Sequence, residues 1–290
     1  MLAITGATGR LGSALRRALA EQGVETLAWS RPMFDLDAPG RAAELIRASR
    51  PDVILHAAAW TDVDGCAREP DLAMRRNGTS VAVLAQAAAE SGSRLLLVST
   101  NEVFDGRRDD GRGYREGDPT RPINAYGRSK LAGEDAAREA FERAGRPEAL
   151  WIVRTAWLFG PPGNDFPSRI VAAARRLPDA EPLPVVADET GSPTYTRDLA
   201  AAILTLVAEA PGGLYHLVNA GSATRREWAD AVLARCAPGR VTRPITQADH
   251  PRPSSAPRWA VLDASTSAKL GIVVRPWQEA LAAYLELGCP

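Results

Sequence analysis

A glycine-rich stretch near the start of the chain limits the fold more than any other feature of the sequence. The apolar residues 1–4 lead directly into residues 5–12, which read TGATGRLG and place glycines in the pattern GxxGxxG. An amphipathic segment rich in Ala and Leu follows to about Gln22, so a strand, a tight turn and a helix start are predicted. Such a turn binds phosphate, because bare backbone lets the anion approach and free N–H groups of the helix point at it. The alternative is a tight strand-to-helix turn without a ligand.

Strands and helices alternate along the first half of the chain. Strands are expected at residues 1–4, 25–29, 53–55, 94–99 and 150–153. Helices are expected between them at residues 10–22, 40–48 and 69–90, and again around Tyr126. This alternation predicts an α/β fold, a doubly wound parallel (Rossmann-like) sheet with helices on both faces and the cofactor at the carboxyl ends of the strands.

The chain is expected to form two parts. Residues 1–158 are predicted to be the dinucleotide-binding domain, and residues 159–290 a mixed region with a smaller C-terminal substrate-binding lobe. In that region we expect strands near 185–186 and at 215–218 to return to the sheet, and the pieces 159–184 and 223–257 to build the lobe. Residues 107–121, rich in Arg, Asp, Gly and Pro, are expected to be an exposed loop.

A phenol and an ammonium stand four residues apart at Tyr126 and Lys130, which places both on one face of a helix. Lys130 is unusual, because Lys269 is the only other lysine among 35 basic residues. A cation beside Tyr126 favours the phenolate, so we expect the tyrosine pKa to fall from about 10 toward neutrality. Such a tyrosine exchanges a proton near pH 7. The alternative is a surface helix with one tyrosine packed inward.

The end of the second strand indicates which dinucleotide is bound. An acidic residue at this position would select NAD, but the chain has Ser30 and Arg31. A hydroxyl and a guanidinium suit a 2′-phosphate, so NADPH is expected, with NADH left open and a solvated Arg31 as the alternative. Asp35 and Leu36 are placed to meet the adenine amine and ring.

The ends of the third and fourth strands supply further site residues. Small residues 57–59 let a cofactor lie against the backbone. His56 has no second ligand at metal spacing and is expected to be a hydrogen-bonded strand-end histidine. Thr100, with Ser99 as the alternative, would face Tyr126 across the cleft and hydrogen-bond a substrate oxygen.

Composition excludes several classes of partner. The formal net charge is zero and no apolar run approaches the roughly 20 residues of a membrane span, so neither nucleic acid nor a membrane is expected as a partner. The three cysteines are scattered without a CxxC pair, which favours reduced thiols in a cytoplasmic protein, as does the lack of a leader before the first strand. The sequence leaves a homodimer open.

Motifs along nearly the whole chain resemble a known family. They are TGATGRLG at 5–12, HAAAWTDVD at 56–64, ST with VFDG at 99–106, the segment around Tyr126, RTAWLFG at 154–160, GNDF at 163–166, GSPT at 191–194, GLYHL at 213–217, Arg252-Pro253, and Leu262-Asp263 with Lys269-Leu270-Gly271. In these motifs the chain resembles the extended short-chain dehydrogenases/reductases, and among them it is most similar to the dTDP-4-dehydrorhamnose reductases. The resemblance implies reduction of the 4-keto group of a nucleotide-linked 6-deoxyhexose, giving dTDP-rhamnose.

The resemblance also implies roles for individual residues. Tyr126 would donate the proton, Lys130 would hold the nicotinamide ribose and lower the tyrosine pKa, and Thr100 would orient the carbonyl. The implied cofactor-binding set is Gly6, Gly9, Arg10, Leu11, Gly12, Ser30, Arg31, Asp35, Leu36, Ala57, Ala58, Ala59, Trp60, Tyr126 and Lys130. The implied substrate-binding set is Thr100, Asn101, Tyr126 and Trp157, with a place in the core as the alternative for Trp157 at the end of a strand.

The chain departs from the family at two places. Asn101-Glu102 stands where the family usually has Asp-Tyr, so a contact to the sugar or the nucleotide is altered. Ala67 stands where a glutamate of an intersubunit metal cluster is common, and no metal is predicted. The Arg- and Pro-rich run 250–258 fits either a set of diphosphate-binding guanidinium groups or a polyproline-like strap.

Two rival functions remain at the level of sequence. One is an epimerase or dehydratase of the same superfamily, which would share Tyr126 and Lys130, and for which Glu102 supplies an acidic group. The other is a non-catalytic NADP-binding subunit, since the regulatory subunit of methionine adenosyltransferase resembles these reductases. A regulator has no need of a proton donor, so the intact Thr, Tyr and Lys set favours an enzyme.

Overall fold

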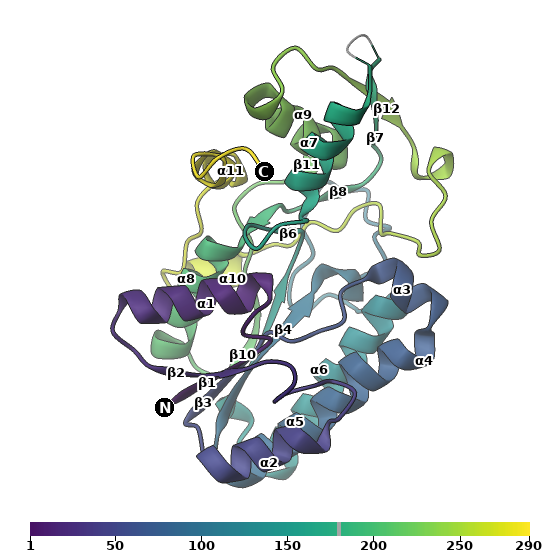
Figure 1. Ribbon diagram of the computed structural model, residues 1–290. Coiled ribbons are helices and arrows are strands. Elements are labelled where there is room, and N and C mark those ends of the chain that lie inside the picture. Colours follow the sequence, from purple (N-terminus) through teal and green to yellow (C-terminus); the bar gives the residue numbers. More distant parts are fainter. Residues whose placement is uncertain (179–180) are drawn as a thin grey trace.

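A six-stranded parallel sheet forms the centre of the molecule in a computed structural model that describes residues 1–178 and 181–290 (Figure 1). The strand order is β10-β5-β4-β3-β1-β2, and every neighbouring pair is parallel. The strands are β1 (Leu2–Thr5), β2 (Thr26–Trp29), β3 (Val53–His56), β4 (Arg94–Thr100), β5 (Leu150–Thr155) and β10 (Gly213–His216). This order, with the switch between β1 and β3, confirms the predicted doubly wound fold.

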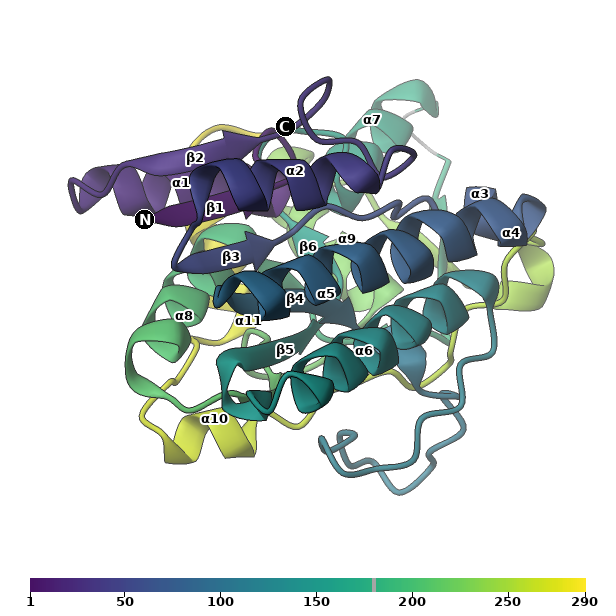
Figure 2. The ribbon, with the colours of Figure 1, turned by 90° about the horizontal axis from the view of Figure 1, so that it is seen from below.

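Two layers of helices cover the sheet. The helices α2 (Gly40–Ser49), α5 (Ser80–Ser91) and α6 (Ala125–Arg143) lie side by side on one face, as Figure 2 shows. The helices α1 (Arg10–Glu21) and α8 (Thr196–Glu209) cover the other face. Apolar side chains fill both interfaces, which explains why the central strands read as continuous apolar runs.

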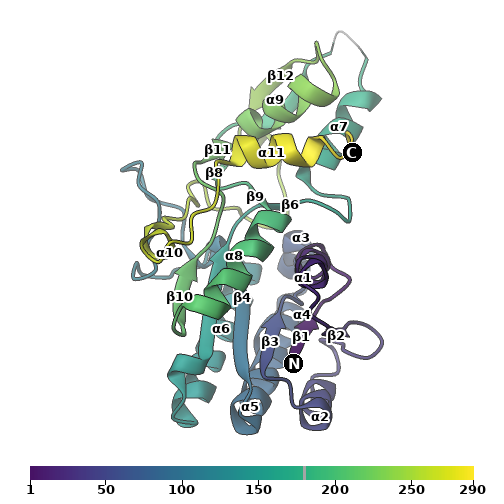
Figure 3. The ribbon, with the colours of Figure 1, turned by 90° about the vertical axis from the view of Figure 1, so that its left-hand side faces the viewer.

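A second group of elements gathers at one end of the molecule, above the sheet in Figures 1 and 3. It contains the helices α7 (Phe166–Arg176), α9 (Arg225–Cys236) and α11 (Trp277–Leu285), and the strands β7 (Leu183–Val186) and β12 (Thr242–Ile245). These elements share an apolar core of their own, with Trp228 and Phe159 fully buried in it. We refer to them as the upper lobe.

The strand near residues 185–186 does not return to the main sheet, so that expectation is wrong, whereas the strand expected at 215–218 does return as β10. Strand β7 pairs instead with β12 in the upper lobe. It buries alternate residues only, and it contains Pro184, which has no N–H for a ladder. A strand inside a parallel sheet is buried on both faces and avoids proline, so β7 suits a small edge pair.

The long helix expected at residues 69–90 is interrupted. The structure has α4 (Pro70–Ala73), a π-helical turn η1 (Met74–Thr79) and then α5. Such a turn carries one extra residue per hydrogen bond, which changes the direction of the side chains that it contains.

The remaining elements are short and lie mostly between the sheet and the upper lobe. They are α3 (Val63–Arg68), η2 (Asn101–Val103), η3 (Pro147–Ala149), β6 (Leu158–Phe159) paired with β9 (Thr194–Tyr195), β8 (Thr190–Gly191) paired with β11 (Ala223–Thr224), η4 (Gln247–Asp249) and α10 (Ser265–Lys269).

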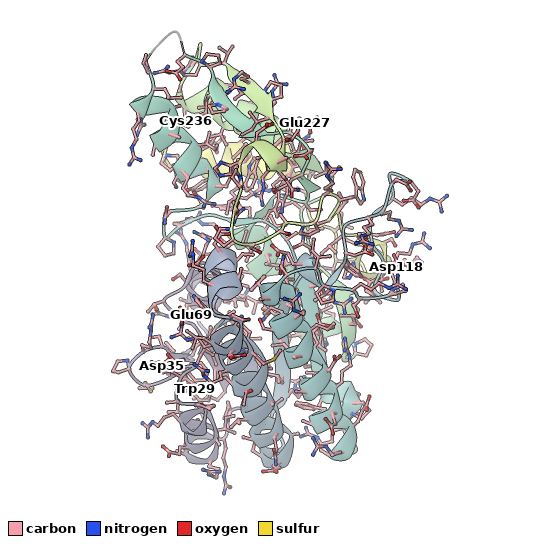
Figure 4. The ribbon with its side chains drawn as sticks, turned by 90° about the vertical axis from the view of Figure 1, so that its right-hand side faces the viewer. Trp29, Asp35, Glu69, Asp118, Glu227 and Cys236 are labelled. Carbon is pink, nitrogen blue, oxygen red and sulfur yellow. A yellow bond between two sulfur atoms is a disulfide. The ribbon has the colours of Figure 1, made fainter. Side chains whose placement is uncertain are left out.

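The segment 107–121 contains neither helix nor strand, as expected, but it is fastened at its middle. Tyr114 is buried, stacks on Phe104 with ring centroids 4.3 Å apart, and forms an isolated bridge to Leu262. Arg108 pairs with Asp110 and Asp118, and Asp118 lies on the outside of the molecule in Figure 4. The charged residues of this segment therefore lie at the surface, while the buried Tyr114 anchors it to the protein.

The expectation of three reduced thiols is wrong for two of them. Cys236, at the end of α9 in the upper lobe (Figure 4), forms a disulfide with Cys289. These residues are 53 positions apart in the sequence, and the packing of α11 against α9 brings them together. Cys66 is free and buried. Across the described residues, no helix is both long and apolar enough to cross a bilayer.

Candidate active site

Helix α6 presents Tyr126 in its first turn because two neighbouring residues fit the helix start. Asn124 caps the helix by accepting a hydrogen bond from the Gly127 N–H at 2.8 Å. A Cβ on Gly127 would lie 2.1 Å from the backbone oxygen of Glu102, so only glycine allows α6 to approach the turn that follows β4. The buried Tyr126 phenol is thereby placed beside the Thr100 hydroxyl.

The two hydroxyls at the end of β4 have different partners. Ser99 donates a hydrogen bond to Glu134 at 2.5 Å, inside the protein. Thr100 lies beside the Tyr126 phenol and opposes the rise of its pKa. Its hydroxyl donates to the Asn101 side-chain oxygen at 3.2 Å and accepts the Glu102 N–H at 3.2 Å. Of the two candidates, Thr100 is therefore the one that the structure brings to the phenol.

The pKa of Tyr126 moves in the direction opposite to the one expected, so that prediction is wrong. Burial raises the pKa of Tyr126, and the negative charge of Glu102 raises it further, while the hydrogen bond to Thr100 works against both. Lys130 does not offset them, because its ammonium is turned toward β4 and donates to the Val98 backbone oxygen at 2.7 Å. At neutral pH the phenol therefore carries its proton.

Lys130 is itself perturbed by its surroundings. It is buried, and burial lowers the pKa of Lys130 to about 8, although the Glu134 carboxylate raises it. An ammonium has three donors, and the Val98 oxygen uses one of them. Lys130 therefore keeps donors for a ligand beside the end of β4.

His56 lies next to this ammonium at the end of β3. Its Nδ1 shares a hydrogen bond with the Thr5 hydroxyl at 2.8 Å, in agreement with the hydrogen-bonded strand-end histidine expected from the sequence. The ring is fully buried, and burial together with the charge of Lys130 lowers the pKa of His56 to about 3. His56 is therefore neutral in the folded protein at any pH at which an enzyme of this kind is assayed.

This neutral histidine makes folding sensitive to acid. The unfolded chain protonates His56 near pH 6.5, whereas the folded protein does so only near pH 3, so stability is full above pH 6.5 and falls as the pH drops toward 3. Each such histidine contributes a slope of about 1.4 kcal/mol per pH unit, and buried His216, whose pKa burial also lowers, adds to it. The free energy of unfolding, measured with urea at pH 7, 6 and 5, should depend less steeply on pH in His56→Gln than in wild type. The difference between the two slopes should correspond to about one proton. Equal slopes in the two proteins would contradict this account.

The glycine turn after β1 fits a phosphate group. Gly6 has φ +63°, and a Cβ on it would lie 2.8 Å from the Ala58 Cα. A Cβ on Gly12 would lie 2.1 Å from the Gly6 oxygen, so α1 packs directly on the turn. Helix α1 starts after Gly9 without a side-chain cap, which leaves its first N–H groups for an anion.

The other expected cofactor residues lie along the same edge of the sheet, with different exposures. The half-buried ones are Arg10, Ser30, Asp35, Leu36, Ala57, Ala58, Ala59 and Trp60. Arg31 is exposed, and the Leu11 side chain is buried in the core, so Leu11 offers only its backbone. The Arg10 guanidinium donates to the Gly160 oxygen at 3.0 Å and so ties α1 to the chain leaving β6.

The π-helical turn supplies a residue that sequence reasoning missed. Asn77 is buried, accepts the Trp60 N–H at 2.9 Å and donates to the Trp60 oxygen at 3.0 Å. Its amide also donates to the Ser129 hydroxyl on α6 at 3.1 Å. Asn77 therefore joins the chain after β3 to the helix of Tyr126. An asparagine within an Ala-rich helical segment was the only sequence signal for this role.

A buried ion pair beneath α6 was also missed. Glu134 receives two hydrogen bonds from Arg154 on β5, at 2.9 and 2.7 Å, and one from Ser99 on β4. Burial raises the pKa of Glu134, but the hydrogen bonds and charge of Arg154 outweigh it and leave the pKa lowered. The pair fixes α6, and with it Tyr126, to the two central strands.

Aromatic and charged groups of the upper lobe surround Trp157. Its ring stacks on Trp228 with centroids 5.8 Å apart, and the Arg225 guanidinium lies 3.5 Å from its centroid. Trp157 has φ 43° and is half-buried, and Arg225 forms an ion pair with Glu189 at 3.2 Å. These contacts give Trp157 the packing role that was left open, while its ring is not fully enclosed.

Asn101, expected among the substrate-binding residues, lies next to Thr100 at the end of β4. It is buried, and its side-chain amide donates to the Ala260 oxygen at 3.0 Å. Its side-chain oxygen accepts the Thr100 hydroxyl at 3.2 Å, so Asn101 joins Thr100 to the C-terminal part of the chain.

Several arginines converge below the upper lobe. Arg169 is exposed as a residue, but partial desolvation of its guanidinium lowers its pKa, and the nearby charges of Arg252 and Arg10 lower it further. Its guanidinium has no hydrogen-bond or ion-pair partner among residues 1–178 and 181–290. By contrast Arg252 pairs with Asp64 at 3.1 Å and Arg258 with Asp188 at 3.0 Å, so the guanidinium groups of the run 250–258 bind carboxylates of the protein. Arg169 is the cation of this group that is left for an anionic ligand.

Comparison with known proteins identifies the family of the chain. The family model described as "RmlD substrate binding domain" matches residues 1–288. A dTDP-4-dehydrorhamnose reductase of Mycobacterium tuberculosis is 42% identical, covering 98% of this chain and 92% of that protein. Solved reductases of the same name, from Clostridium acetobutylicum and, in complex with NADP, from Bacillus anthracis, are 31% and 30% identical with TM-scores of 0.91 and 0.89, each covering 99% of this chain and 98% of theirs. The predicted resemblance is confirmed, and the chain belongs to the dTDP-4-dehydrorhamnose reductase family.

Proposed function

We propose that the protein is an NADPH-dependent reductase that converts dTDP-4-dehydrorhamnose to dTDP-rhamnose. The observation that carries the proposal is the pairing of Thr100 with a protonated Tyr126, on the same sheet edge as a bare glycine turn. Relatives with this name cover nearly the whole chain, and the B. anthracis structure contains NADP.

Each group of the site has one task in this reaction. NADPH, when bound, supplies the hydride for the keto carbon. Tyr126 gives its phenolic proton to the ketone oxygen, which becomes the hydroxyl of the product. Thr100 orients that oxygen, and the free donors of Lys130 hold the ribose of the cofactor. The high pKa of Tyr126 keeps the donor protonated until the oxygen gains negative charge.

The cofactor is proposed to lie along the ends of β1, β2 and β3. The glycine turn receives the pyrophosphate at the start of α1, since no side chain caps that helix. Ser30 and the exposed Arg31 receive the 2′-phosphate, because no carboxylate follows β2 at this point to select NAD.

The nucleotide of the substrate is proposed to lie toward the upper lobe. Arg169 is placed to bind its diphosphate, because a guanidinium matches phosphate oxygens in pairs and this one has no protein partner among the described residues. The neighbouring positive charges of Arg10 and Arg252 strengthen the attraction of this position for a diphosphate. A bound anion would also reduce the repulsion among the three guanidinium groups.

The experiment is a comparison of cofactor use and cofactor retention. We expect loss of NADPH absorbance when dTDP-4-dehydrorhamnose is added, a lower rate with NADH, and purified protein that releases its nicotinamide readily. An epimerase or dehydratase recycles its cofactor and keeps it bound. Tightly retained cofactor without net consumption, or cofactor binding without any turnover, would favour one of the two rival functions.

A further inference from the structure

Glu102 is an acidic residue in the turn that separates Thr100 from the helix of Tyr126. It belongs to the turn η2, two residues after Thr100, and its N–H donates to the Thr100 hydroxyl at 3.2 Å. Its backbone oxygen lies against Gly127 at the start of α6. The backbone of Glu102 is therefore fixed between Thr100 and Gly127, the residue that follows Tyr126.

Only one of the two Glu102 carboxylate oxygens has a hydrogen-bond partner among the described residues. Oε2 accepts a hydrogen bond from the Asn124 amide at 2.6 Å. Oε1 has no hydrogen-bond partner in the described chain, and no cation lies within ion-pair distance of it there. A carboxylate accepts hydrogen bonds at both oxygens, and a partly buried one without partners is costly. The free oxygen is thus an acceptor without a donor.

The surroundings of Glu102 place this acceptor in the substrate site. Its charge raises the pKa of the Tyr126 phenol, and its backbone oxygen packs against Gly127, the residue after Tyr126. Burial raises the pKa of Glu102, whereas the Asn124 hydrogen bond and the charges of Arg225 and Arg252 lower it. Glu102 thus stands between the proton donor and the upper lobe, where the proposed substrate lies.

The chemistry of the substrate identifies the missing donor. A 4-keto-6-deoxyhexose has two carbons next to the ketone, and C5 carries only the methyl group and the ring oxygen, whereas C3 carries a hydroxyl. With the ketone oxygen held by Thr100 and Tyr126, the C3 hydroxyl is the sugar donor adjacent to the reacting carbon. We propose that Glu102 is a specificity-determining residue that accepts a hydrogen bond from this C3 hydroxyl. The inference rests on the proposed function and adds a substrate contact to it.

The test combines a residue change with a substrate change. Turnover is measured with dTDP-4-dehydrorhamnose and with the analogue that has hydrogen in place of the C3 hydroxyl, in wild type and in Glu102→Ala. The Asn124 amide keeps a second acceptor, the Ser255 oxygen at 2.9 Å, so the change leaves that cap satisfied. Glu102→Gln, which retains an oxygen acceptor, should recover part of any loss. The matched control is Glu209→Ala, which changes an exposed glutamate at the end of α8.

We expect Glu102→Ala to lower kcat/KM for the hydroxylated sugar by about 10- to 100-fold, the range of one hydrogen bond to a charged group. The analogue should react equally well with wild type and variant, because it lacks the donor. Equal losses on both sugars, or no loss on either, would overturn the Glu102 contact alone. A wild-type enzyme that turns over neither sugar would overturn the proposed function, and the contact with it.

Discussion

Replacing Tyr126 with phenylalanine is expected to lower kcat for reduction of the keto-sugar by about 10²- to 10⁴-fold, the usual contribution of a positioned general acid. The variant removes one oxygen and keeps the ring that α6 presents, so NADPH binding and the melting temperature should change little. The ketone oxygen would then have only the Thr100 hydroxyl beside it, and no group of suitable pKa to give it a proton.

Tyr195 provides a matched control for this change. It is a buried tyrosine in the upper lobe whose hydroxyl has no hydrogen-bond partner among the described residues, so Tyr195→Phe should leave kcat unchanged. The measurement is the rate of NADPH oxidation at saturating sugar. A Tyr126→Phe enzyme that keeps more than about a tenth of the wild-type kcat would show that another group donates the proton.

Replacing Glu134 with alanine is expected to reduce the free energy of unfolding by about 3–5 kcal/mol, the usual cost of breaking a buried ion pair. The change leaves the Arg154 guanidinium buried, 2% exposed, without its carboxylate. It also removes the acceptor of Ser99, so α6 loses its ion pair with β5 and one of its side-chain hydrogen bonds to β4. Urea unfolding at pH 7 measures the loss.

The same helix offers the control. Glu139 pairs with Arg143 at the surface, where both side chains are about two-thirds exposed, and Glu139→Ala should change stability by less than about 1 kcal/mol. Replacing Glu134 and Arg154 together by leucine and methionine should cost less than the sum of the single changes, because no unpaired charge remains. Equal effects of Glu134→Ala and Glu139→Ala would contradict the anchoring role.

The parts of the fold that depend on a local sequence pattern could be predicted from the sequence. A glycine turn between a strand and a helix, and apolar runs alternating with amphipathic segments, predict a parallel sheet with its cofactor edge. The four-residue spacing of Tyr126 and Lys130 likewise predicts one helix face. These features depend on neighbouring residues, which the sequence places directly.

The features that were missed depend on which distant elements meet. Lys130 is on the expected face, but its ammonium bonds the Val98 oxygen of β4, so it does not lower the pKa of Tyr126. Strand β7 finds its partner in β12, and Cys236 finds Cys289, only after the upper lobe has packed. The bonds of Asn77 require a π-helical turn that no spacing rule predicts.

Transfer of deuterium from NADPH labelled at the hydride position to the sugar tests the central claim most directly. A reductase with the site described here places the label on C4 of dTDP-rhamnose, one deuterium for each NADPH consumed, and Tyr126→Phe slows the transfer without moving its position. Sugar product that carries no label, or label that returns to the cofactor while the sugar is isomerised or dehydrated, would contradict the account.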